Sequence, residues 1–457
     1  MKIIIFSLLI ISAIFAAREA DLMAGPLPGC SNDNFNQYSG YLDVTSSKKF
    51  HYVFVESQND PANDPLLFWF NGGPGCSSMI GFISENGPCV FLDDADHTPQ
   101  DNPHSWNKFA NIVYLESPAS VGFNHFTGIP TYNDEKVSHE NLKAVQEWFQ
   151  AFPEYKEHEL YLSGESYAGI YVPYLALRID EYNQESNDHI NLKGFFIGNG
   201  VTNWKYDTTP AFVELAFAHG LINLDLQERI NKANCDFTEV GGSTSLKCRY
   251  LLSEFYEQTK HVYPYDIYRP PEEIYTSPNP GNLLKSLLFS DDDESECRYG
   301  GFAGAVRNMP KRSSNEFLPV KRYLNKEEVK AALNIPSQYS WSECKGIGYT
   351  KSKEASQWIY PKLKGRYRMM HYSGTTDAVV PTIGTERWMN DLGWPTVTDR
   401  KPWFSEPLLI GGYTESREGN LDFITIHGTG HMVPQWKRPE SAIAISHWLA
   451  EDDLPRE

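Results

Sequence analysis

The chain has 457 residues, of which 41% are hydrophobic, 14% aromatic and 22% charged. Its 40 Lys and Arg residues face 59 Asp and Glu residues, which gives a formal net charge of −19 and argues against general binding to nucleic acid. The many aromatic residues argue against disorder, and the length fits two or three domains or one large α/β domain with an insertion. The seven cysteines are an odd number, so at least one of them has no partner within the chain.

The first 17 residues have the pattern of a secretory signal peptide. Lys2 precedes an apolar run at 3–15, and the small residues Ala16 and Ala17 follow it. The run is too short to cross a bilayer comfortably, although an uncleaved anchor is the alternative. No other stretch approaches 18 apolar residues, so we expect no membrane span once this segment is removed. We therefore expect a mature chain that enters the secretory pathway and forms disulfides there.

Residues 18–200 alternate between strand-like and helix-like stretches. This alternation predicts a mostly parallel sheet covered by helices, the first part of an α/β core. The expected strands are 51–55, 65–70, 112–115, 159–162 and 194–197, and the expected helices are 140–151 and 170–182.

Residues 201–351 are polar and rich in helix-like stretches, with irregular Pro- and Asp-rich pieces, and we expect them to form a cap inserted into the core. Strand signals return at 368–372 and 423–426, and an amphipathic helix is expected at 439–450. Residues 352–457 are therefore expected to complete the α/β core.

A candidate nucleophile lies between an expected strand and an expected helix. Residues 160–169 read as a strand leading into G-x-S-x-A-G, with Ser166 at the centre. Gly164 and the small residues Ala168 and Gly169 allow the sharp turn that presents a serine at the end of a strand. The usual motif has glycine where Ala168 stands, and alanine is small enough for the same place.

A serine nucleophile needs a base and an orienting carboxylate, which follow it in the order Asp, then His, in this type of fold. Asp377 lies in a Gly- and Thr-rich loop directly after one expected strand, and His431 lies in a loop after another. His427 adjoins its strand, as packed histidines do, so His431 is the favoured base. The rival residues are Asp391, Asp399, Asp422 and His427.

The sequence offers no metal motif, and we expect no metal and no cofactor. His158 and Glu159 begin H-E-x-x-H, but Leu162 stands where the second histidine is required. The sequence contains no C-x-x-C pair.

Three segments together resemble the signature segments of the serine carboxypeptidases, the family of cathepsin A and carboxypeptidase Y. They are 70–78 (FNGGPGCSS), 164–169 (GESYAG) and 430–434 (GHMVP). Supporting segments are 37–42, 85–88, 116–119 and 198–200, and the resemblance runs from about Leu27 to Leu449. It implies an α/β-hydrolase fold with a helical cap, and release of C-terminal amino acids from peptides and proteins.

The resemblance also assigns roles in catalysis. It implies Ser166 as nucleophile, His431 as general base and acid, and Asp377 as the partner that orients His431. The oxyanion hole would consist of the backbone N–H groups of Gly73 and Tyr167, because a tetrahedral oxyanion needs donors that are fixed before its charge develops.

The resemblance further implies a network of hydrogen bonds that binds the free terminal carboxylate of the substrate. Two ionised glutamates would repel that carboxylate, whereas a close carboxyl pair readily holds a proton. We therefore expect peptide binding that is best at acidic pH and weakens as the glutamates ionise. The matching residues are Trp69, Asn71, Gly72, Glu85 and Glu165.

Two positions depart from the family pattern. The family often has G-D-x-D before the catalytic aspartate, whereas this chain has Gly, Thr and Thr at 374–376, and Ser120 stands where glycine is frequent. The missing acid puts a local support of Asp377 in doubt. For specificity, Met432 together with Val379 and Val380 predicts a site that prefers apolar residues over basic ones.

The resemblance implies the disulfides Cys76–Cys344 and Cys235–Cys248. At most one more pair can form among the remaining three cysteines. Cys89 lies four residues after Glu85 and is our first candidate for the free thiol. The remaining cysteines are Cys30, Cys89 and Cys297.

Two other functions remain open. A serine carboxypeptidase-like acyltransferase would use the same triad, but such enzymes commonly lose the asparagine that is retained here as Asn71. The other is a non-catalytic hydrolase-fold binding protein. The sequence has no Asn-x-Ser/Thr sequon and leaves open a lysosomal, vacuolar or secreted destination, a cut near Lys311 and Arg312, and a homodimer.

Overall fold

The computed structural model describes residues 19–92, 98–129, 131–240, 245–270 and 317–456. The expected signal peptide, Cys297, and the Lys311-Arg312 pair lie outside these residues. Within the described ranges, no helix is both long enough and apolar enough to span a bilayer.

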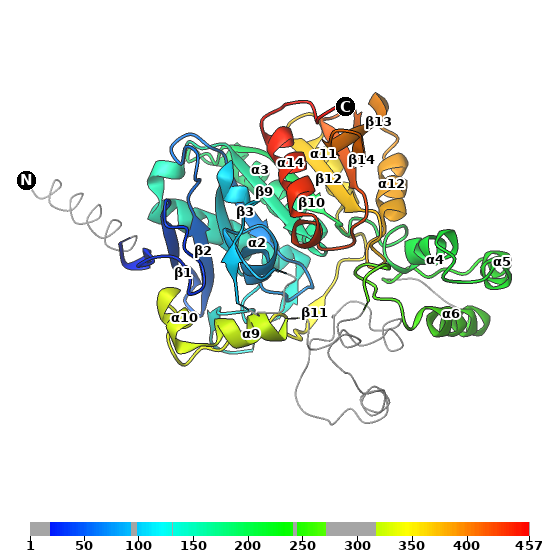
Figure 1. Cartoon of the computed structure of the whole chain (residues 1–457), viewed down its shortest axis with the longest axis horizontal. Coiled ribbons are helices and arrows are strands. Elements are labelled where there is room, and N and C mark those ends of the chain that lie inside the picture. The colour runs from blue at the N-terminus through cyan, green and yellow to red at the C-terminus, as the bar shows by residue number, and fades with distance from the viewer. Residues whose placement is uncertain (1–18, 93–97, 130, 241–244, 271–316, 457) are drawn as a thin grey trace, which may run out of the picture.

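An eleven-stranded sheet forms the centre of the molecule (Figure 1). Its strands run in the order β1-β2-β6-β3-β9-β10-β12-β15-β14-β13, and β7 pairs with β2 outside this path. The six strands from β6 to β15 are parallel, whereas the pairs at the two ends are antiparallel. The predicted mostly parallel sheet is therefore confirmed. The strands are β1 (Gln37–Thr45), β2 (Lys48–Val55), β3 (Leu66–Phe70), β6 (Asn111–Leu115), β7 (His125–Phe126), β9 (Leu160–Glu165), β10 (Leu192–Gly198), β12 (Arg368–Gly374), β13 (Thr396–Glu406), β14 (Leu409–Arg417) and β15 (Leu421–Ile426).

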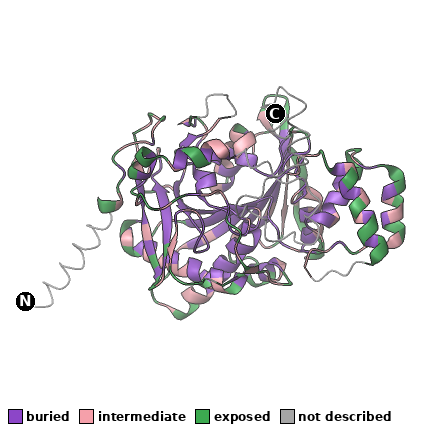
Figure 2. Cartoon of the chain, turned by 90° about the horizontal axis from the view of Figure 1, so that it is seen from below, coloured by how far each residue is buried: buried purple, intermediate pink, exposed green. Residues whose placement is uncertain are grey.

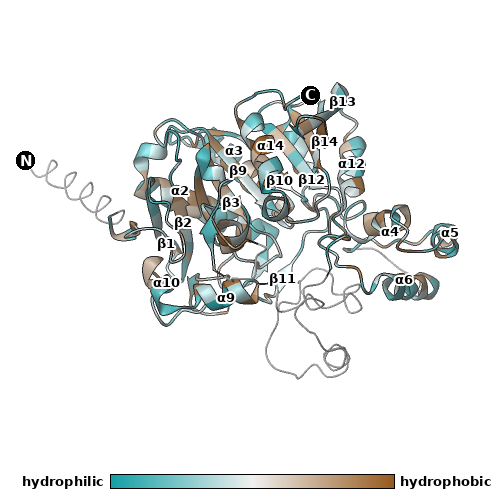
Figure 3. Ribbon diagram, viewed as in Figure 1, coloured by the Kyte–Doolittle hydropathy of each residue, from teal (hydrophilic) through white to brown (hydrophobic). Residues whose placement is uncertain are grey.

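The central strands are apolar because both faces of the sheet are covered. All five residues of β3 are buried, and they alternate between two hydrophobic cores. Leu66, Phe68 and Phe70 face one core, while Leu67 and Trp69 face the other. Figure 3 shows the hydrophobic colour concentrated on the strands of the sheet and mixed colours on the surrounding helices.

Two groups of helices cover the two faces. The first core includes residues of α2 (Asp134–Ala151) and α3 (Ala168–Glu185), which extend the two helices expected from the sequence. The second core includes residues of α14 (Arg438–Leu449). The Asn133 side chain accepts a hydrogen bond from the Lys136 N–H (2.8 Å) and so caps α2. Shorter helices are η1 (Gly81–Glu85), η2 (Trp106–Lys108), η3 (Pro153–Tyr155), η5 (Gln357–Ile359), α11 (Tyr360–Leu363), α12 (Thr382–Asp391) and α13 (Val433–Trp436).

The block between β10 and β12 is inserted between two strands that pair with each other in the sheet. Its helices α4 (Thr209–Ala218), α5 (Leu224–Ala233) and α6 (Leu246–Thr259) form a third small core and project from one side of the molecule (Figure 1, Figure 2). Two further helices, α9 (Leu318–Leu324) and α10 (Glu327–Ala332), lie apart from these three, along the lower edge of the molecule in Figure 1, and the Leu333 carbonyl directly after α10 accepts from Ser39 of β1 (2.6 Å). Small two-stranded sheets pair β4 (Cys89–Val90) with β5 (Gln100–Asp101) and β8 (Tyr132–Asn133) with β11 (Tyr349–Thr350).

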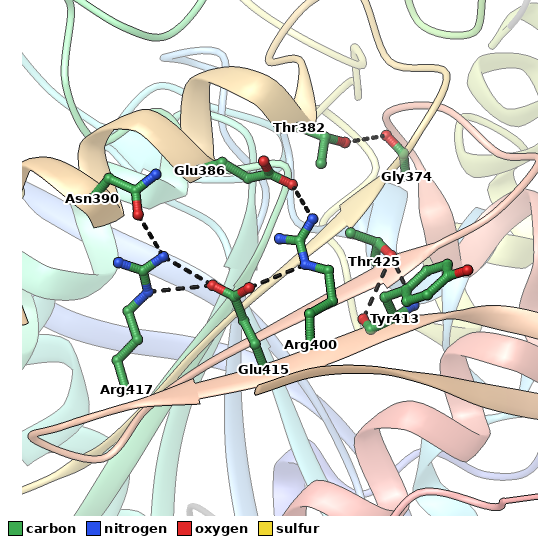
Figure 4. A network of polar contacts seen from close by, with 9 residues as sticks. All are labelled: Gly374, Thr382, Glu386, Asn390, Arg400, Tyr413, Glu415, Arg417 and Thr425. Atoms are coloured by element: carbon green, nitrogen blue, oxygen red, sulfur yellow. Dashed lines mark hydrogen bonds and ion pairs between the residues drawn. The ribbon is translucent and has the colours of Figure 1, made fainter. Parts of the chain in front are cut away.

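The β13–β14 hairpin was not expected from the sequence. Most side chains of β13 are exposed, so the strand has no apolar alternation to mark it. Polar contacts attach the hairpin to α12 (Figure 4): Glu415 accepts from Arg400 (Nε–Oε2 3.0 Å) and Arg417 (Nη2–Oε1 2.9 Å), and the two arginines also contact Glu386 and Asn390 of α12. The hairpin is therefore held by strand pairing and polar contacts, together with Trp403, the residue of β13 that is buried in the second core.

Six of the seven cysteines form disulfides. Cys76–Cys344 and Cys235–Cys248 are the pairs that the resemblance implies. The third bridge joins Cys30 to Cys89, so Cys89 as first candidate for the free thiol is wrong. The separation of 59 residues in sequence hid this pair, because the two residues meet only in the folded chain.

Candidate active site

Ser166 occupies a sharp turn between β9 and α3. Its φ angle is 66°, a left-handed conformation that is uncommon for a residue other than glycine. The Ser166 N–H donates to the Gly198 carbonyl (3.0 Å), and its carbonyl accepts from the N–H groups of Gly169 (2.9 Å) and Val201 (3.0 Å). Backbone contacts on both sides of the turn therefore hold the strained conformation.

A cavity opens beside this turn, beyond the carboxyl end of the parallel strands. It brings together Ser166, His431 and Glu165 with the Gly-rich loop that follows β3. The lining residues are Asn71, Gly72, Gly73, Cys76, Ile80, Glu165, Ser166, Tyr265, His431 and Met432. Ligand sites of open α/β sheets commonly lie at this edge.

His431 is hydrogen-bonded to Asp377, with 2.7 Å between its Nδ1 and the Asp377 Oδ2, and both side chains are buried. Asn199 donates from Nδ2 to the same Oδ2 (2.8 Å). The N–H groups of Val379 (2.7 Å) and Val380 (3.1 Å) donate to Oδ1 and Oδ2. These donors fix the carboxylate, and the bond at Nδ1 leaves Nε2 as the nitrogen that can accept a proton.

The rival residues lie in other surroundings. Asp391 accepts from Tyr206, Asp422 accepts from Ser416 and Trp448, and Asp399 is exposed on β13. The ring of His427 is half-buried against Tyr413.

The Gly-rich loop packs directly against the serine turn. A methyl group on Gly72 would overlap the backbone nitrogen of Tyr167 and come within 2.8 Å of the Glu165 carbonyl oxygen. Gly73 has a φ of 111°, which a larger residue rarely adopts. The loop therefore reaches the backbone of Tyr167 only because these two residues lack side chains.

A chain of buried hydrogen bonds leads from Trp69 to Glu85. Trp69 Nε1 donates to Asn71 Oδ1 (2.8 Å), and Asn71 Nδ2 donates to Glu85 Oε1 (2.8 Å). Burial raises the pKa of the Glu85 carboxyl, while hydrogen bonds with Asn71 and Glu165 and the charges of His431 and Arg438 oppose the rise. The two glutamates thus form a buried carboxyl pair, which favours one shared proton.

Of the three residues expected to form the specificity pocket, one lines the cavity and two lie elsewhere. Met432 lines the cavity. Val380 is fully buried in the first core and Val379 is half-buried, and within the described part of the chain neither lines the cavity. Tyr265 and Ile80 do line it and were missed, because neither stands in a motif of its own.

One of the two departures from the family pattern has a structural counterpart. Ser120 has a φ of 77°, which explains why glycine suits its position, and its hydroxyl hydrogen-bonds to the Tyr132 hydroxyl (2.8 Å). In the loop before Asp377, Thr376 donates from Oγ1 to Oδ1 of Asp266 (2.7 Å). No group of three His, Cys, Asp or Glu in the described ranges is arranged to hold a metal ion.

A mostly parallel sheet with covering helices, a helical insertion and a strained serine turn at the carboxyl edge define the α/β-hydrolase fold. The solved structure of Kex1(delta)p, a prohormone-processing carboxypeptidase from Saccharomyces cerevisiae, has the same fold. It superposes with a TM-score of 0.72 at 20% sequence identity and covers 95% of this chain and 96% of that one.

The chain belongs to the serine carboxypeptidase family, whose sequence pattern matches residues 28–451. It is 33% identical over 475 residues to "Serine carboxypeptidase-like 34" of Arabidopsis thaliana, covering 97% of this chain and 91% of the relative. It is 32% identical over 466 residues to "Lysosomal protective protein" of Mus musculus, covering 93% of each. The predicted enzyme class, a serine-type carboxypeptidase and therefore a hydrolase, is thereby confirmed at the level of the family.

Proposed function

We propose that this chain releases C-terminal amino acids from peptides and proteins, through an acyl-enzyme formed on Ser166. The observation that carries the proposal is a buried carboxyl pair, Glu85 and Glu165, beside a serine and an Asp-supported histidine in one cavity. The serine, histidine and aspartate would catalyse hydrolysis. The carboxyl pair would bind the terminal carboxylate of the peptide and so direct cleavage to the last peptide bond.

In the proposed reaction, Ser166 Oγ attacks the carbonyl carbon of the last peptide bond while His431 Nε2 takes the hydroxyl proton. Asp377 holds the imidazole in the required tautomer and stabilises its positive charge. The tetrahedral intermediate expels the terminal amino acid, which receives its proton from His431. His431 then takes a proton from a water molecule, which attacks the acyl carbon. The bond from that carbon to Ser166 Oγ breaks, Oγ receives the proton from His431, and the shortened peptide leaves with a free carboxyl group.

The backbone N–H groups of Gly73 and Tyr167 are the proposed oxyanion hole. The close packing of Gly72 on the Tyr167 nitrogen supports this assignment, because it brings the Gly-rich loop next to the serine turn. Removing a donor of this kind typically costs about 10²–10³ in rate.

The terminal carboxylate of the substrate is proposed to bind at Asn71, the Gly72 N–H and the Glu85–Glu165 pair, with Trp69 holding the Asn71 amide. A protonated carboxyl can donate a hydrogen bond to that carboxylate, while an ionised pair repels it. Because burial raises the pKa of Glu85, the proton persists in acidic solution and is lost as the pH rises. We therefore propose that KM is lowest at acidic pH.

We propose that Met432 favours apolar residues at the substrate C-terminus, since it lines the cavity. A panel of blocked dipeptides tests this point. Cleavage before Phe or Leu should exceed cleavage before Lys or Arg, and the reverse order would refute the assignment.

We also propose that the enzyme works in the secretory pathway, in a lysosome or vacuole or after secretion. The signal-like pattern of residues 1–17 and the three disulfides support this, and the mouse relative is named as lysosomal.

The central experiment compares the purified mature protein with its Ser166→Ala variant on a blocked dipeptide at pH 5. We expect release of the terminal amino acid by the parent protein and none above background by the variant. Ser163→Ala is the matched control, because Ser163 lies on the same strand and its hydroxyl donates to the Phe68 carbonyl (3.1 Å). This variant should keep the activity.

A second arm uses the same dipeptide with its terminal carboxylate amidated. Slower release of the amidated residue is expected if the carboxyl pair recognises a free carboxylate. Equal rates for both substrates would refute that recognition. Acyl transfer to an added alcohol without any release by hydrolysis would instead identify an acyltransferase, and neither reaction would indicate a binding protein.

A further inference from the structure

A short segment of the inserted block lies between the two loops that carry Asp377 and His431. The N–H of His431 donates to the Tyr265 carbonyl (2.6 Å), and the N–H of Ala378 donates to the Pro264 carbonyl (2.9 Å). In return, the N–H of Ile267 donates to the Thr376 carbonyl (3.0 Å). The segment 264–267, here called the strut, is therefore hydrogen-bonded to both loops.

Asp266 is the charged residue of the strut and is 4% exposed. Its Oδ1 accepts from Thr376 Oγ1 (2.7 Å), the residue directly before Asp377, and from the N–H of Tyr268 (3.1 Å). Its Oδ2 lies 3.8 Å from Arg269 Nε. The Asp266 side chain thus holds the Asp377 loop.

The other side of the strut presses on the His431 loop. A methyl group on Gly430 would overlap the Tyr265 carbonyl oxygen and approach the Asp266 Cα to 2.7 Å. The Tyr265 ring also contacts the His431 ring edge to face, with 5.4 Å between centroids. Tyr265 contacts the His431 loop, and Asp266 contacts the Asp377 loop. Because these two residues are consecutive, the strut couples the positions of the two loops.

We propose that Asp266 is a positioning residue for the reaction, which fixes the separation of the Asp377 carboxylate and the His431 imidazole through its contact with Thr376. This inference rests on the proposed catalytic roles of these two residues. Within the described residues the Asp266 side chain does not line the cavity, and it acts on the loop before Asp377. Displacing a catalytic group by about 1 Å can cost about 10²-fold in rate, so one hydrogen bond at this place has a measurable effect on turnover.

The test compares Asp266→Ala, Thr376→Val and the double variant on the blocked dipeptide. Each single variant removes one partner of the same hydrogen bond, and we expect kcat to fall about 10- to 100-fold with KM changed less than about twofold. The double variant should resemble the single variants, because the bond is lost only once. Asp266→Asn keeps an acceptor oxygen for Thr376 and should recover most of the lost kcat.

Asp422→Ala is the matched control. Asp422 also accepts from a hydroxyl, that of Ser416 (2.6 Å), but it lies near the start of β15, whereas the His431 loop follows the end of that strand. We expect this variant to lower the melting temperature and to leave kcat within about twofold of the parent value.

A structural role alone would lower the melting temperature of Asp266→Ala and leave kcat of the folded fraction unchanged, and that result overturns the proposal. A loss of kcat in the double variant equal to the product of the single losses would also overturn it. If Asp266→Ala does not fold, Thr376→Val decides the question, because it keeps the shape of the side chain.

An organophosphonate probe that labels Ser166 separates this inference from the proposed function. Its reaction needs the serine and histidine but no peptide. If the parent protein is labelled yet releases no amino acid, the carboxypeptidase proposal fails and slower labelling of Thr376→Val still supports the strut. If the parent protein is not labelled, both proposals fail.

Discussion

The two halves of the site are built in different ways. The serine half consists of Ser166 and the Gly-rich loop, whose positions depend on short segments and on close backbone packing. The histidine half consists of Asp377 and His431, which are held by groups from distant parts of the chain, including Asn199 and the strut.

This difference predicts different sensitivities. Added atoms should damage the serine half, because backbone segments there are in contact. Loss of a single polar group should damage the histidine half, because side-chain and backbone hydrogen bonds set its geometry. The following experiments test that contrast.

The largest effect is expected for Asp377→Asn. The amide would turn a donor toward either His431 Nδ1 or the Val379 N–H, both of which now face an acceptor oxygen. We expect kcat to fall about 10⁴-fold because the imidazole is held in the wrong tautomer. Asp399→Asn, on the exposed strand β13, is the control and should leave kcat unchanged. A loss of less than tenfold would show that another carboxylate orients the base.

The second effect tests the serine half with one added methyl group. Gly72→Ala should lower kcat by about 10²–10³, because the methyl group would separate the loop from the Tyr167 backbone and move a donor of the proposed oxyanion hole. Gly346→Ala is the matched control, since a methyl group there meets no atom within 4 Å. Unchanged kcat in Gly72→Ala would mean that the loop does not need its close contact with the serine turn.

The parallel strands and the serine turn were predictable, because continuous apolar runs and a contiguous motif mark them. The β13–β14 hairpin was not, because its outer strand is exposed and carries charges where apolar residues would have marked it. Polar contacts with α12 hold it, and those partners are remote in sequence.

Within the site, the long-range supports were not predictable. Asn199 lies in a segment that supported the family resemblance, but nothing in that segment indicates that its amide reaches Asp377. Asp266 precedes Thr376 by 110 residues and stands in no recognised motif. Proximity to Asp377 alone suggests Val379 and Val380 for the pocket, whereas their N–H groups bind its carboxylate. Sequence adjacency therefore located the loops without showing which way their side chains point.

Substrate affinity is expected to change with pH. The carboxyl pair lies next to the serine half, since Glu165 directly precedes Ser166, and titration of the pair should set the pH dependence of KM. From pH 5 to pH 8 we expect KM of the parent protein to rise roughly tenfold or more. Glu85→Gln carries a permanent donor in place of the shared proton and should show a much smaller rise. An equal rise in both proteins would assign the dependence to another group.

The smallest effect is expected on stability, and it comes from buried groups outside both halves. Burial raises the pKa of Glu116 to about 8 and that of Asp207 to about 7, so both contribute stability at acidic pH that is lost as the pH rises toward those values. Burial lowers the pKa of His51 and of His371 to about 3, so both contribute stability above pH 6.5 that is lost as the pH falls below it.

The two effects oppose each other between the usual pKa of a glutamate, 4.5, and that of a histidine, 6.5. Of these four groups only the two carboxyl groups change protonation above pH 6.5, so the melting temperature of the parent protein should fall by a few degrees between pH 6.5 and pH 8. Glu116→Gln should show a smaller fall, which scanning calorimetry of both proteins at matched ionic strength can measure. If the melting temperature rises over this interval, Glu116 is ionised in the folded protein, and its hydrogen bonds with Ser77 and the Phe123 N–H outweigh its burial.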